Sequence, residues 1–399
     1  MTIDKENCCG CSACAAICPK ECIELVSDEE GFIYPKYNLD NCIHCHLCEN
    51  VCPVSNLICE TETKQYGYAV QNTDHKVLIE STSGGAFTAI AEQVINLGGV
   101  VYGASLDSNL MVRHVGVNRI DELRIFRNSK YSQSYIDPKI FREIKDELTS
   151  NRWVLFSGTA CQTEGLVHYL NTSYENLILV DVLCHSVPSP LVLRRYIEYQ
   201  QCKQGKRISS VRFRDKYYGY TYPTMNVIVE GEKSSYHCGA ESDPYLRAFL
   251  SGICSRPSCY SCKFRKRYRV SDYTLWDCHN PGRYSKEMDN NCGATNLLIQ
   301  SEKGRKLFDQ IAGKFVSIEV DPDLLITDGA GSMRSLIPLN KNRRDFMKDA
   351  VELRGDKLFE KWFPIKQSNK IKHCMRVVLC KMGIYDFLKK MYVKATKKY

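Results

Sequence analysis

The chain has 399 residues, of which 44% are hydrophobic and 25% are charged, and its formal net charge is +8. This composition is typical of a globular protein and excludes intrinsic disorder and collagen-like repeats, and the length predicts two or three domains. No run of 18 apolar residues occurs, so we expect no membrane-spanning helix. Because the first ten residues do not resemble a secretory signal, we expect a cytoplasmic protein whose 22 cysteines are ligands, reactive thiols or packing residues rather than disulfides.

Cysteine and charge are both unevenly distributed along the chain. Residues 1–60 contain 11 of the 22 cysteines. Residues 365–399 contain ten Lys or Arg and one acidic residue, which is a net charge of +9 and leaves −1 for residues 1–364. The main part of the protein is therefore almost neutral, and we expect no nucleic-acid partner.

The cysteines of the first 60 residues form a duplicated pattern. The run CCGCSACAAICP has the spacing C-x2-C-x2-C-x3-C-P, and CIHCHLCENVCP repeats every ligand position 34 residues later. In proteins with two 4Fe-4S clusters, the fourth cysteine of each run binds the other cluster. The pattern therefore predicts one cluster on Cys8, Cys11, Cys14 and Cys52. It predicts a second cluster on Cys42, Cys45, Cys48 and Cys18.

This segment resembles the bacterial two-cluster ferredoxin, and we predict such a domain over residues 1–60. Short strands at 22–26 and 32–34 would form a hairpin beside the clusters. The alternative is a zinc ribbon, which uses paired C-x2-C knuckles instead. We interpret Cys9, Cys22 and Cys59 as packing residues. His44 and His46 are interpreted as solvated, or as hydrogen-bonded to cluster sulfur.

Beyond a polar linker at 60–65, strands and helices alternate. Strands are predicted at 66–71, 100–104, 153–157 and 177–183, and helices at 86–97, at 137–150, from the end of the 158–162 turn to 170, and from after 189 to about 202. This alternation predicts parallel strands covered by helices. Ligands in such sheets bind beyond the carboxyl ends of the strands, where residues 158–162 and 184–189 lie.

The second half of the body differs in pattern. Residues 208–238 predict an antiparallel β meander, 243–252 a helix, and 292–354 a further alternation of strand and helix. The predicted fold class is therefore α+β and α/β, with a ferredoxin-like head and a larger α/β body. We divide the body into residues 66–205 and 206–355, followed by a basic amphipathic tail at 356–399. Neither a Rossmann fingerprint nor a P-loop motif occurs.

Six short motifs follow one another in the body. They are SGGAFTA at 83–89, FSGTACQ at 156–162, VDVLCHSVPS at 180–189, FRDK at 213–216, RPSCYSCKF at 256–264 and SDYT at 271–274. With the cysteine-rich head, this order resembles the coenzyme F420 hydrogenase/dehydrogenase beta-subunit family over residues 1–340. The resemblance implies an FAD-binding α/β body that passes electrons between iron–sulfur clusters and a two-electron carrier or substrate. In archaeal relatives that carrier is the deazaflavin coenzyme F420.

The chain departs from the family pattern at three places, which leave the substrate open. Ala160 replaces a proline, residues 276–279 replace a Gly-Asp-Phe-Trp-like run, and residues 218–220 replace Gly-Trp. Ser83, Gly84 and Gly85 open a predicted helix, whose backbone N–H groups would hold the flavin pyrophosphate. The alternative for these residues is an ordinary helix cap.

Four body cysteines are candidate ligands of a third 4Fe-4S cluster. Two lie at predicted strand ends and two share a C-x2-C loop, and the alternative is four unrelated cysteines. The four residues are Cys161, Cys184, Cys259 and Cys262.

Four further polar residues lie near the predicted site. Lys216 and Arg214 end a strand of the meander, where a cation would favour reduced flavin or an anionic substrate; the alternative is a solvated strand end. His185 is a candidate proton carrier or a structural residue. Asp272 either orients a ligand or caps a turn, and we prefer the cap.

The sequence therefore predicts an iron–sulfur flavoprotein oxidoreductase with a small-molecule substrate and a redox partner protein or small electron carrier. The alternative is a non-catalytic electron-transfer subunit that docks a partner enzyme. Apolar residues recur at helical spacing among the lysines of the tail. Such a helix either packs on the body, which we prefer, or rests on an anionic membrane at its inner face.

Overall fold

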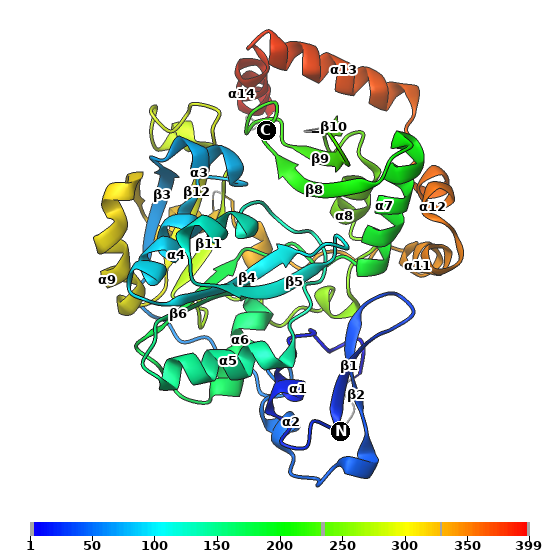
Figure 1. Cartoon of the computed structure of the whole chain (residues 1–399). Coiled ribbons are helices and arrows are strands. Elements are labelled where there is room, and N and C mark those ends of the chain that lie inside the picture. Colours follow the sequence, from blue (N-terminus) through cyan, green and yellow to red (C-terminus); the bar gives the residue numbers. More distant parts are fainter. Residues whose placement is uncertain (1–3, 233–235, 328, 397–399) are drawn as a thin grey trace.

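The computed structural model describes residues 4–232, 236–327 and 329–396, so residues 1–3 and 397–399 of the predicted end segments lie outside it. Figure 1 shows three parts of the molecule. A small cysteine-rich head lies at one end, a large sheet with its helices occupies the centre, and a smaller sheet carries the two tail helices at the other end.

The head consists of the hairpin that the sequence predicts and of short helical segments that it does not. Strands β1 (Ile23–Ser27) and β2 (Ile33–Tyr37) pair antiparallel, and the helical segments are α1 (Ala13–Ile17), η1 (Leu39–Asn41) and α2 (Leu47–Asn50). The hairpin turn includes Gly31, whose φ is +83° and whose Cβ, if present, would lie 2.6 Å from the Cβ of Leu191. A glycine is therefore required where the turn packs against the body helix α7 (Pro190–Gln204).

The central sheet has eight strands in the order β13-β3-β12-β11-β7-β6-β4-β5. The strands are β3 (Tyr66–Asn72), β4 (Val100–Leu106), β5 (Val112–Val117), β6 (Val154–Thr159), β7 (Leu177–Val182), β11 (Tyr273–Cys278), β12 (Ala294–Ile299) and β13 (Phe315–Val320). Within this sheet the neighbours β4–β6, β6–β7 and β7–β11 run parallel, and the other pairs are antiparallel. The expectation of parallel strands is therefore wrong for the outer strands, and β5 and β11 were not predicted.

The two faces of this sheet are covered by different helices. Alternate residues such as Val101, Leu155 and Ile178 form one core with α4 (Ala86–Asn96) and α9 (Glu302–Ile311). Their neighbours Val100, Val154 and Leu177 face the other way and pack with α5 (Pro138–Thr149) and α6 (Ala160–Leu170). The second core also includes Cys11, Ala13 and Ala16, so the head packs on the α5–α6 face.

The smaller sheet is the predicted antiparallel meander. It contains β8 (Ile208–Asp215), β9 (Thr224–Val229) and β10 (Tyr236–Cys238), and its core includes residues of α7, α8 (Pro244–Leu250), α11 (Arg343–Glu352) and α12 (Gly355–Trp362). Two short helices, α3 (His75–Glu80) and α10 (Pro322–Thr327), flank β3 and β13. The tail forms α13 (Gln367–Lys381) and α14 (Tyr385–Thr396). None of the described helices is both long and apolar enough to cross a bilayer.

Arg256 lies at the boundary between head and body and is 1% exposed. Its Nε donates to Cys8 O at 2.7 Å, its Nη2 to Ile33 O at 3.1 Å and its Nη1 to Gln133 Oε1 at 3.1 Å. The guanidinium also lies 4.0 Å from the ring centroid of Tyr34. A buried charge is normally paired with an opposite charge, but these three acceptors are all uncharged. The planar five-donor fork of arginine is what allows one side chain to hold both the cysteine loop and the hairpin.

We predict that Arg256→Met lowers the free energy of unfolding by about 2–4 kcal/mol, because two buried backbone carbonyls lose their donor. Limited proteolysis should then cleave the head before the body. The control is Arg119→Met, because Arg119 is exposed and forms an ion pair with the equally exposed Asp121. Chemical denaturation measures both variants, and equal stability of the two would contradict the role of Arg256.

Candidate iron–sulfur sites and the loop beside Lys216

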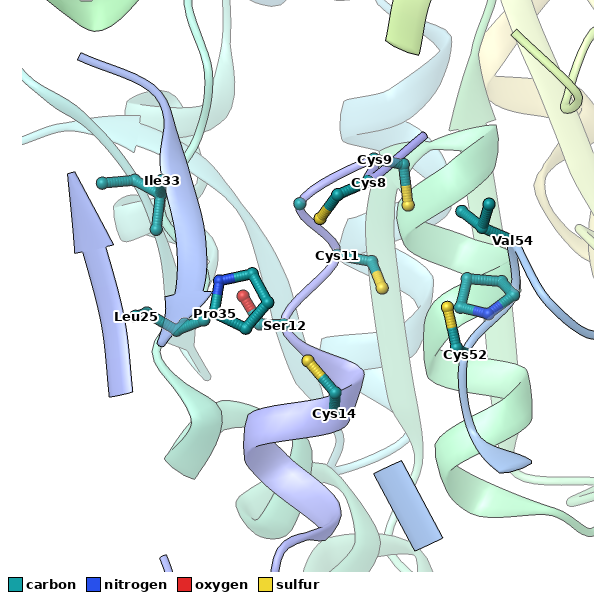
Figure 2. A pocket seen from close by; sticks show the side chains of 12 residues that line it. Cys8, Cys9, Cys11, Ser12, Cys14, Leu25, Ile33, Pro35, Cys52 and Val54 are labelled. Atoms are coloured by element: carbon teal, nitrogen blue, oxygen red, sulfur yellow. The ribbon is translucent and has the colours of Figure 1, made fainter. Parts of the chain in front are cut away.

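The four cysteines predicted to bind the first cluster line one cavity. Cys8, Cys11 and Cys14 come from the first run and Cys52 from the second, around a cavity of about 430 Å³ that includes space open to solvent. Figure 2 shows Cys52 on a separate chain segment, across the cavity from the loop that bears the other three. The remaining wall is largely apolar and includes Leu25, Ile33 and Pro35 of the hairpin.

The backbone repeats the duplication that the sequence shows. Gly10 and Ser12 have φ values of +74° and +72°, and the residues 34 positions later, His44 and His46, have φ values of +54° and +59°. Left-handed backbone at the same two places makes both cysteine loops curve in the same way. His44 also donates its N–H to Cys42 Sγ at 3.4 Å, so the two histidines shape the second loop through their backbone. The His46 ring pairs with Glu49 at 3.2 Å.

The environment of these thiols fits a group that supplies positive charge. Burial, followed by the charges of Cys8 and Cys52, raises the pKa of Cys14 to about 12. Burial likewise raises the pKa of Cys48, with Glu49 adding to the effect. Such thiols stay protonated unless a metal replaces the proton, and iron does so on coordination. The cysteines of the first cavity therefore fit an iron–sulfur cluster.

The second predicted cluster lies next to the first. Cys14, Cys18, Cys42 and Cys48 all pack against the small core of Ala15, Cys22 and Ile23. Cys18 and Cys22 have their sulfurs 3.3 Å apart, so Cys22 is in contact with a predicted ligand as well as being buried. The predicted ligand Cys45 and the predicted packing residue Cys59 are both exposed. The packing interpretation is therefore wrong for Cys59, because the chain leaves the head at that position.

The candidate cysteines of the third cluster surround a second cavity. Cys161, Cys259 and Cys262 line about 410 Å³, which includes space open to solvent. Cys184 is close enough to these three cysteines for their charges to act on it. Together with burial, which has the largest effect, they raise the pKa of Cys184 well above the ordinary value. Cys9 lines both this cavity and the first, as does Val54. Sequence reasoning interpreted Cys9 as a packing residue, and the only available signal was its position beside the ligand Cys8.

The positive charge of Arg256 affects the cysteines of this second cavity. Arg256 lines it, and its positive charge partly offsets the burial that raises the pKa of Cys259 to about 12. The same charge acts on Cys161, whose pKa is raised well above the ordinary value by contact with Cys9 and by burial. Among the residues that the structure describes, no group of three or more His, Cys, Asp or Glu is placed to hold a single metal ion.

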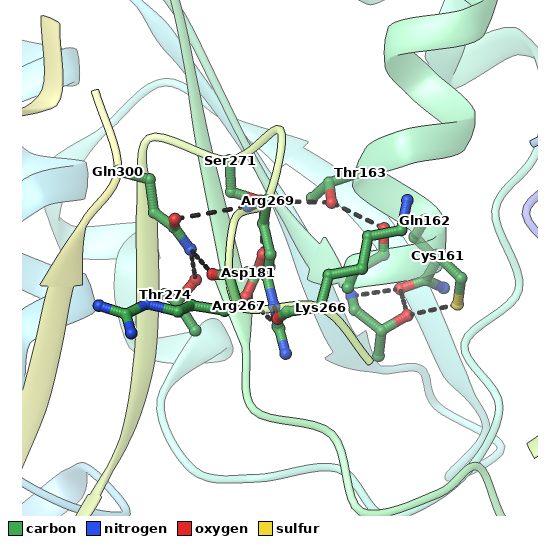
Figure 3. A network of polar contacts seen from close by, with 12 residues as sticks. Cys161, Gln162, Thr163, Asp181, Lys266, Arg267, Arg269, Ser271, Thr274 and Gln300 are labelled. Atoms are coloured by element: carbon green, nitrogen blue, oxygen red, sulfur yellow. Dashed lines mark hydrogen bonds and ion pairs between the residues drawn. The ribbon is translucent and has the colours of Figure 1, made fainter. Parts of the chain in front are cut away.

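A buried polar network positions the cysteine loop against helix α6 (Figure 3). Arg269 donates to Asp181 at 2.7 Å, and their side chains are 4% and 0% exposed. Ser271 donates to the other oxygen of Asp181 at 2.6 Å. Lys266 pairs with Glu164 of α6 at 2.8 Å and donates to Ile58 O at 2.6 Å. The network therefore ties the loop after Cys262 to the helix that begins beside Cys161 and to the chain leaving the head.

The predicted pyrophosphate loop is tightly packed on the sheet. Gly85 is the N-cap of α4 with a φ of +77°, and the N–H of Gly84 donates to Thr295 Oγ1 at 2.8 Å. Ser83 Oγ contacts the same hydroxyl at 2.7 Å. A Cβ on Gly84 would lie 2.5 Å from Thr295 N, so this glycine is needed for close approach to β12. The amide of Gly84 is therefore already used within the protein.

Lys216 is buried and holds this loop from the other side. Its Nζ donates to Leu78 O at 2.8 Å, Ser83 O at 2.5 Å and Cys292 O at 2.6 Å. Burial lowers the pKa of Lys216 to about 7. An ammonium group has three donors, and all three are used here. Arg214 is engaged in an ion pair with Asp277, so neither cation is a solvated strand end.

The other two polar candidates, His185 and Asp272, lie away from the loop that Lys216 holds. His185 follows Cys184 in the chain; its ring centroid lies 5.2 Å from that of Phe249, and its carbonyl accepts from Arg265 at 2.5 Å. Burial lowers the pKa of His185. Asp272 accepts from Leu179 N at 2.8 Å and from Ser301 Oγ at 2.5 Å, so it joins β7 to the start of α9. His185 and Lys216 thus have no hydrogen-bond partner in common among the described residues.

Comparison with known proteins finds a family match in each of two parts of the chain. Residues 7–56 match the family model described as a 4Fe-4S dicluster domain, and residues 151–322 match the model for the C terminus of the coenzyme F420 hydrogenase/dehydrogenase beta subunit. A chain in a solved structure of the xenon-derivatized F420-reducing NiFe hydrogenase complex from Methanosarcina barkeri is similar, with 14% identity and a TM-score of 0.44. That similarity covers 78% of this chain and 97% of the other. No curated protein matches.

We predict that Asp181→Asn lowers the free energy of unfolding by about 3–5 kcal/mol, because it leaves the guanidinium of Arg269 buried without its counter-charge. The control is Asp323→Asn. It breaks an ion pair with Arg267, which lies on the same loop as Arg269, but the side chain of Asp323 is 73% exposed. The control should lower the free energy of unfolding by far less, because exposed ion pairs contribute little to stability. Denaturant titrations compare the two, and an equal loss would contradict the importance of burial.

We also predict that Lys216→Met destabilises the fold by about 2–4 kcal/mol, because buried carbonyls lose their shared donor. The control is Lys389→Met, because Lys389 is exposed and donates to the single carbonyl of Thr221. Thermal unfolding of protein without added ligand measures the effect. A normal melting temperature for Lys216→Met would show that the lysine is not a brace of the loop.

Proposed function

We propose that this chain, which combines a 4Fe-4S dicluster domain with the C-terminal domain of the coenzyme F420 hydrogenase/dehydrogenase beta subunit, is an iron–sulfur flavoprotein oxidoreductase. The observation that carries the proposal is the contact between the two cysteine-lined cavities, which share Cys9 and Val54. The head then serves as the entry or exit for single electrons, and the body completes the path through a third cluster on Cys161, Cys184, Cys259 and Cys262.

The order of the proposed path follows from the positions of the cysteines. Cys48 of the second run acts electrostatically on Cys14 of the first, so the two head sites are neighbours. The first site adjoins the body cavity through Cys9. Arg256 holds the loop of Cys8 and lines the body cavity, so it fixes the distance between them. Because each step is to a neighbouring site, the arrangement supports a one-electron relay from head to body.

Flavin binding in the body is the part of the proposal that rests on the family. When bound, FAD would exchange single electrons with clusters and electron pairs with a carrier such as coenzyme F420 or with a small substrate. The residues near the Ser83–Gly85 loop fit in part. The buried hydroxyls of Ser132 and Thr224 have no hydrogen-bond partner among the described residues. Ser132 lies three residues after Ser129, whose hydroxyl contacts that of Thr82. Thr224 lies opposite Asp215 in the pairing of β9 with β8, and Asp215 precedes Lys216 in the chain.

The roles of the chain's own residues are more restricted than the sequence indicates. Lys216 would hold the loop in shape rather than donate to a ligand, since its three protons already reach backbone carbonyls. His185 would act, if it moves protons, beside the cluster cavity. We propose the same four segments of the chain: the head at 1–60, the two parts of one body at 66–205 and 206–355, which share the eight-stranded sheet, and the tail at 356–399.

One observation favours the alternative function, a non-catalytic electron-transfer subunit that docks a partner enzyme. The amide of Gly84 and all three protons of Lys216 are used internally, so these two residues offer no donor to a flavin or substrate in this conformation. The electron relay would then end at the body cluster, and a redox partner protein would carry out the two-electron chemistry. Flavin content distinguishes the two proposals.

We predict that the anaerobically purified chain contains about twelve irons, four for each of three clusters, together with extractable FAD. Cys259→Ala should remove about four irons and leave the two head clusters. The control is Cys202→Ala, because Cys202 is exposed on α7 and should change neither value. Iron analysis, absorbance and flavin extraction measure these quantities. About eight irons in the wild type would exclude the third cluster, and clusters without flavin would exclude the enzyme in favour of the electron-transfer subunit.

A further inference from the structure

The tail helix α13 is oriented unusually for a helix on a globular body. Four of its apolar residues are exposed to solvent: Ile371, Met375, Val378 and Met382 are 51%, 59%, 54% and 63% exposed. At 100° per residue these four positions fall within about 60° of the helix circumference, so they form one stripe. A surface helix normally buries such a stripe against the core.

The opposite face of α13, which is polar, attaches the helix to the body. Asn369 donates to Glu241 O at 2.6 Å, and Arg376 donates to Glu241 Oε2 at 2.5 Å. His373 contacts Glu241 at 3.5 Å and the hydroxyl of Tyr222 at 2.9 Å. Burial opposes ionisation of Glu241, but its bonds with His373, Tyr222 and Arg376 hold its pKa at about 2. The helix is therefore anchored through charge, with its apolar stripe outward.

Helix α14 repeats this arrangement. Phe387, Met391 and Tyr392 are 63%, 54% and 70% exposed, and Leu388 beside them is 42% exposed. On the other side, Lys390 pairs with Asp289 of the body at 2.7 Å and with Asp386 at 2.6 Å. Figure 1 shows both helices at the end of the molecule that lies away from the cysteine-rich head. Eight exposed apolar side chains thus lie on the two tail helices, and we call these eight together the tail surface.

The charges around the tail surface indicate what covers it. Lys370 and Lys381 are exposed on one side of the α13 stripe and Lys372 on the other. Asp386 is the one acidic residue of positions 365–399, where the net charge is +9, and it is already paired with Lys390. A second copy bound by the same surface would bring like charges together. An apolar stripe flanked by lysines matches instead the boundary between acyl chains and anionic headgroups.

We propose that the tail surface docks the protein on an anionic lipid membrane, with α13 and α14 lying in the interface and not crossing it. Binding combines burial of the apolar stripe with attraction of the flanking lysines to lipid headgroups. The redox head then faces away from the lipid, where a partner can reach it. The inference does not depend on the proposed redox function, because it rests on the tail alone.

The test is flotation of the full-length holoprotein with vesicles of phosphatidylcholine, with and without phosphatidylglycerol. We expect binding only to the anionic vesicles. The double variant Met375→Glu/Val378→Glu should lower the partition coefficient about tenfold or more, because each change removes apolar area from the lipid. The control is Leu339→Glu, which alters a residue that is 68% exposed in a loop of the body and should bind as the wild type does.

Two further measurements separate the competing occupants. In Phe387→Trp, we expect the new indole to be quenched by brominated lipids, which distinguishes insertion from charge attraction alone. Sedimentation velocity without lipid reports self-association. Failure of the wild type to float, or equal binding by Met375→Glu/Val378→Glu, overturns the proposal. Loss of a dimer or of a bound protein in that variant, without vesicle binding, assigns the surface to protein instead. Iron content, measured in every variant, shows whether the redox sites are intact.

Discussion

The structure depends on one buried arginine that joins two parts of the chain. Arg256 donates to the carbonyls of Cys8 and Ile33 and faces no carboxylate among those acceptors. It comes from the loop that also carries Cys259 and Cys262, so one side chain sets the position of the head relative to the body cavity. Keeping a charge inside without a counter-ion is costly, and the thiols around both cavities offer a reason for it. In the proposed relay these thiols would bind iron as thiolates, and their negative charge would lie beside the arginine.

The second constraint is the way the cysteine loop is fastened. Cys161 begins α6, whereas Cys259 and Cys262 lie on a loop with little regular structure of its own. The ion pairs Arg269–Asp181 and Lys266–Glu164 hold that loop to the sheet and to α6. The proposed ligands of a third cluster would need a geometry fixed more tightly than a free loop allows, and the polar network supplies that fixation. The contact of Cys9 with both cavities places the head site and the body site next to each other.

The Lys216 region and the tail show how burial changes the meaning of a charged residue. Lys216 and Arg214 sit where a solvent-exposed cation would contact a ligand, yet one holds three carbonyls and the other an aspartate. In the tail, charged residues make the contacts with the body and apolar residues face the solvent. His373 and Arg376 anchor α13 through Glu241, and the methionines and valine that would normally face the core remain outside. The tail thus packs on the body, as preferred from the sequence, but with the opposite face from the one expected of an amphipathic helix.

The sequence alone determined whatever is local or periodic. The duplicated cysteine spacing, the hairpin between the runs, the helix after Gly85 and the meander all follow from patterns within about a dozen residues. Tertiary structure decided the rest. Strand β3 pairs antiparallel with β12, more than 200 residues away, and no local signal encodes that partner. Cys9 resembled a packing residue because most residues around its second cavity lie beyond position 160. Lys216 resembled an exposed end because its acceptors lie on α3, on the loop after α3 and just before β12, all far from it along the chain. Contacts between segments this far apart depend on the folded geometry, which spacing along the chain does not record.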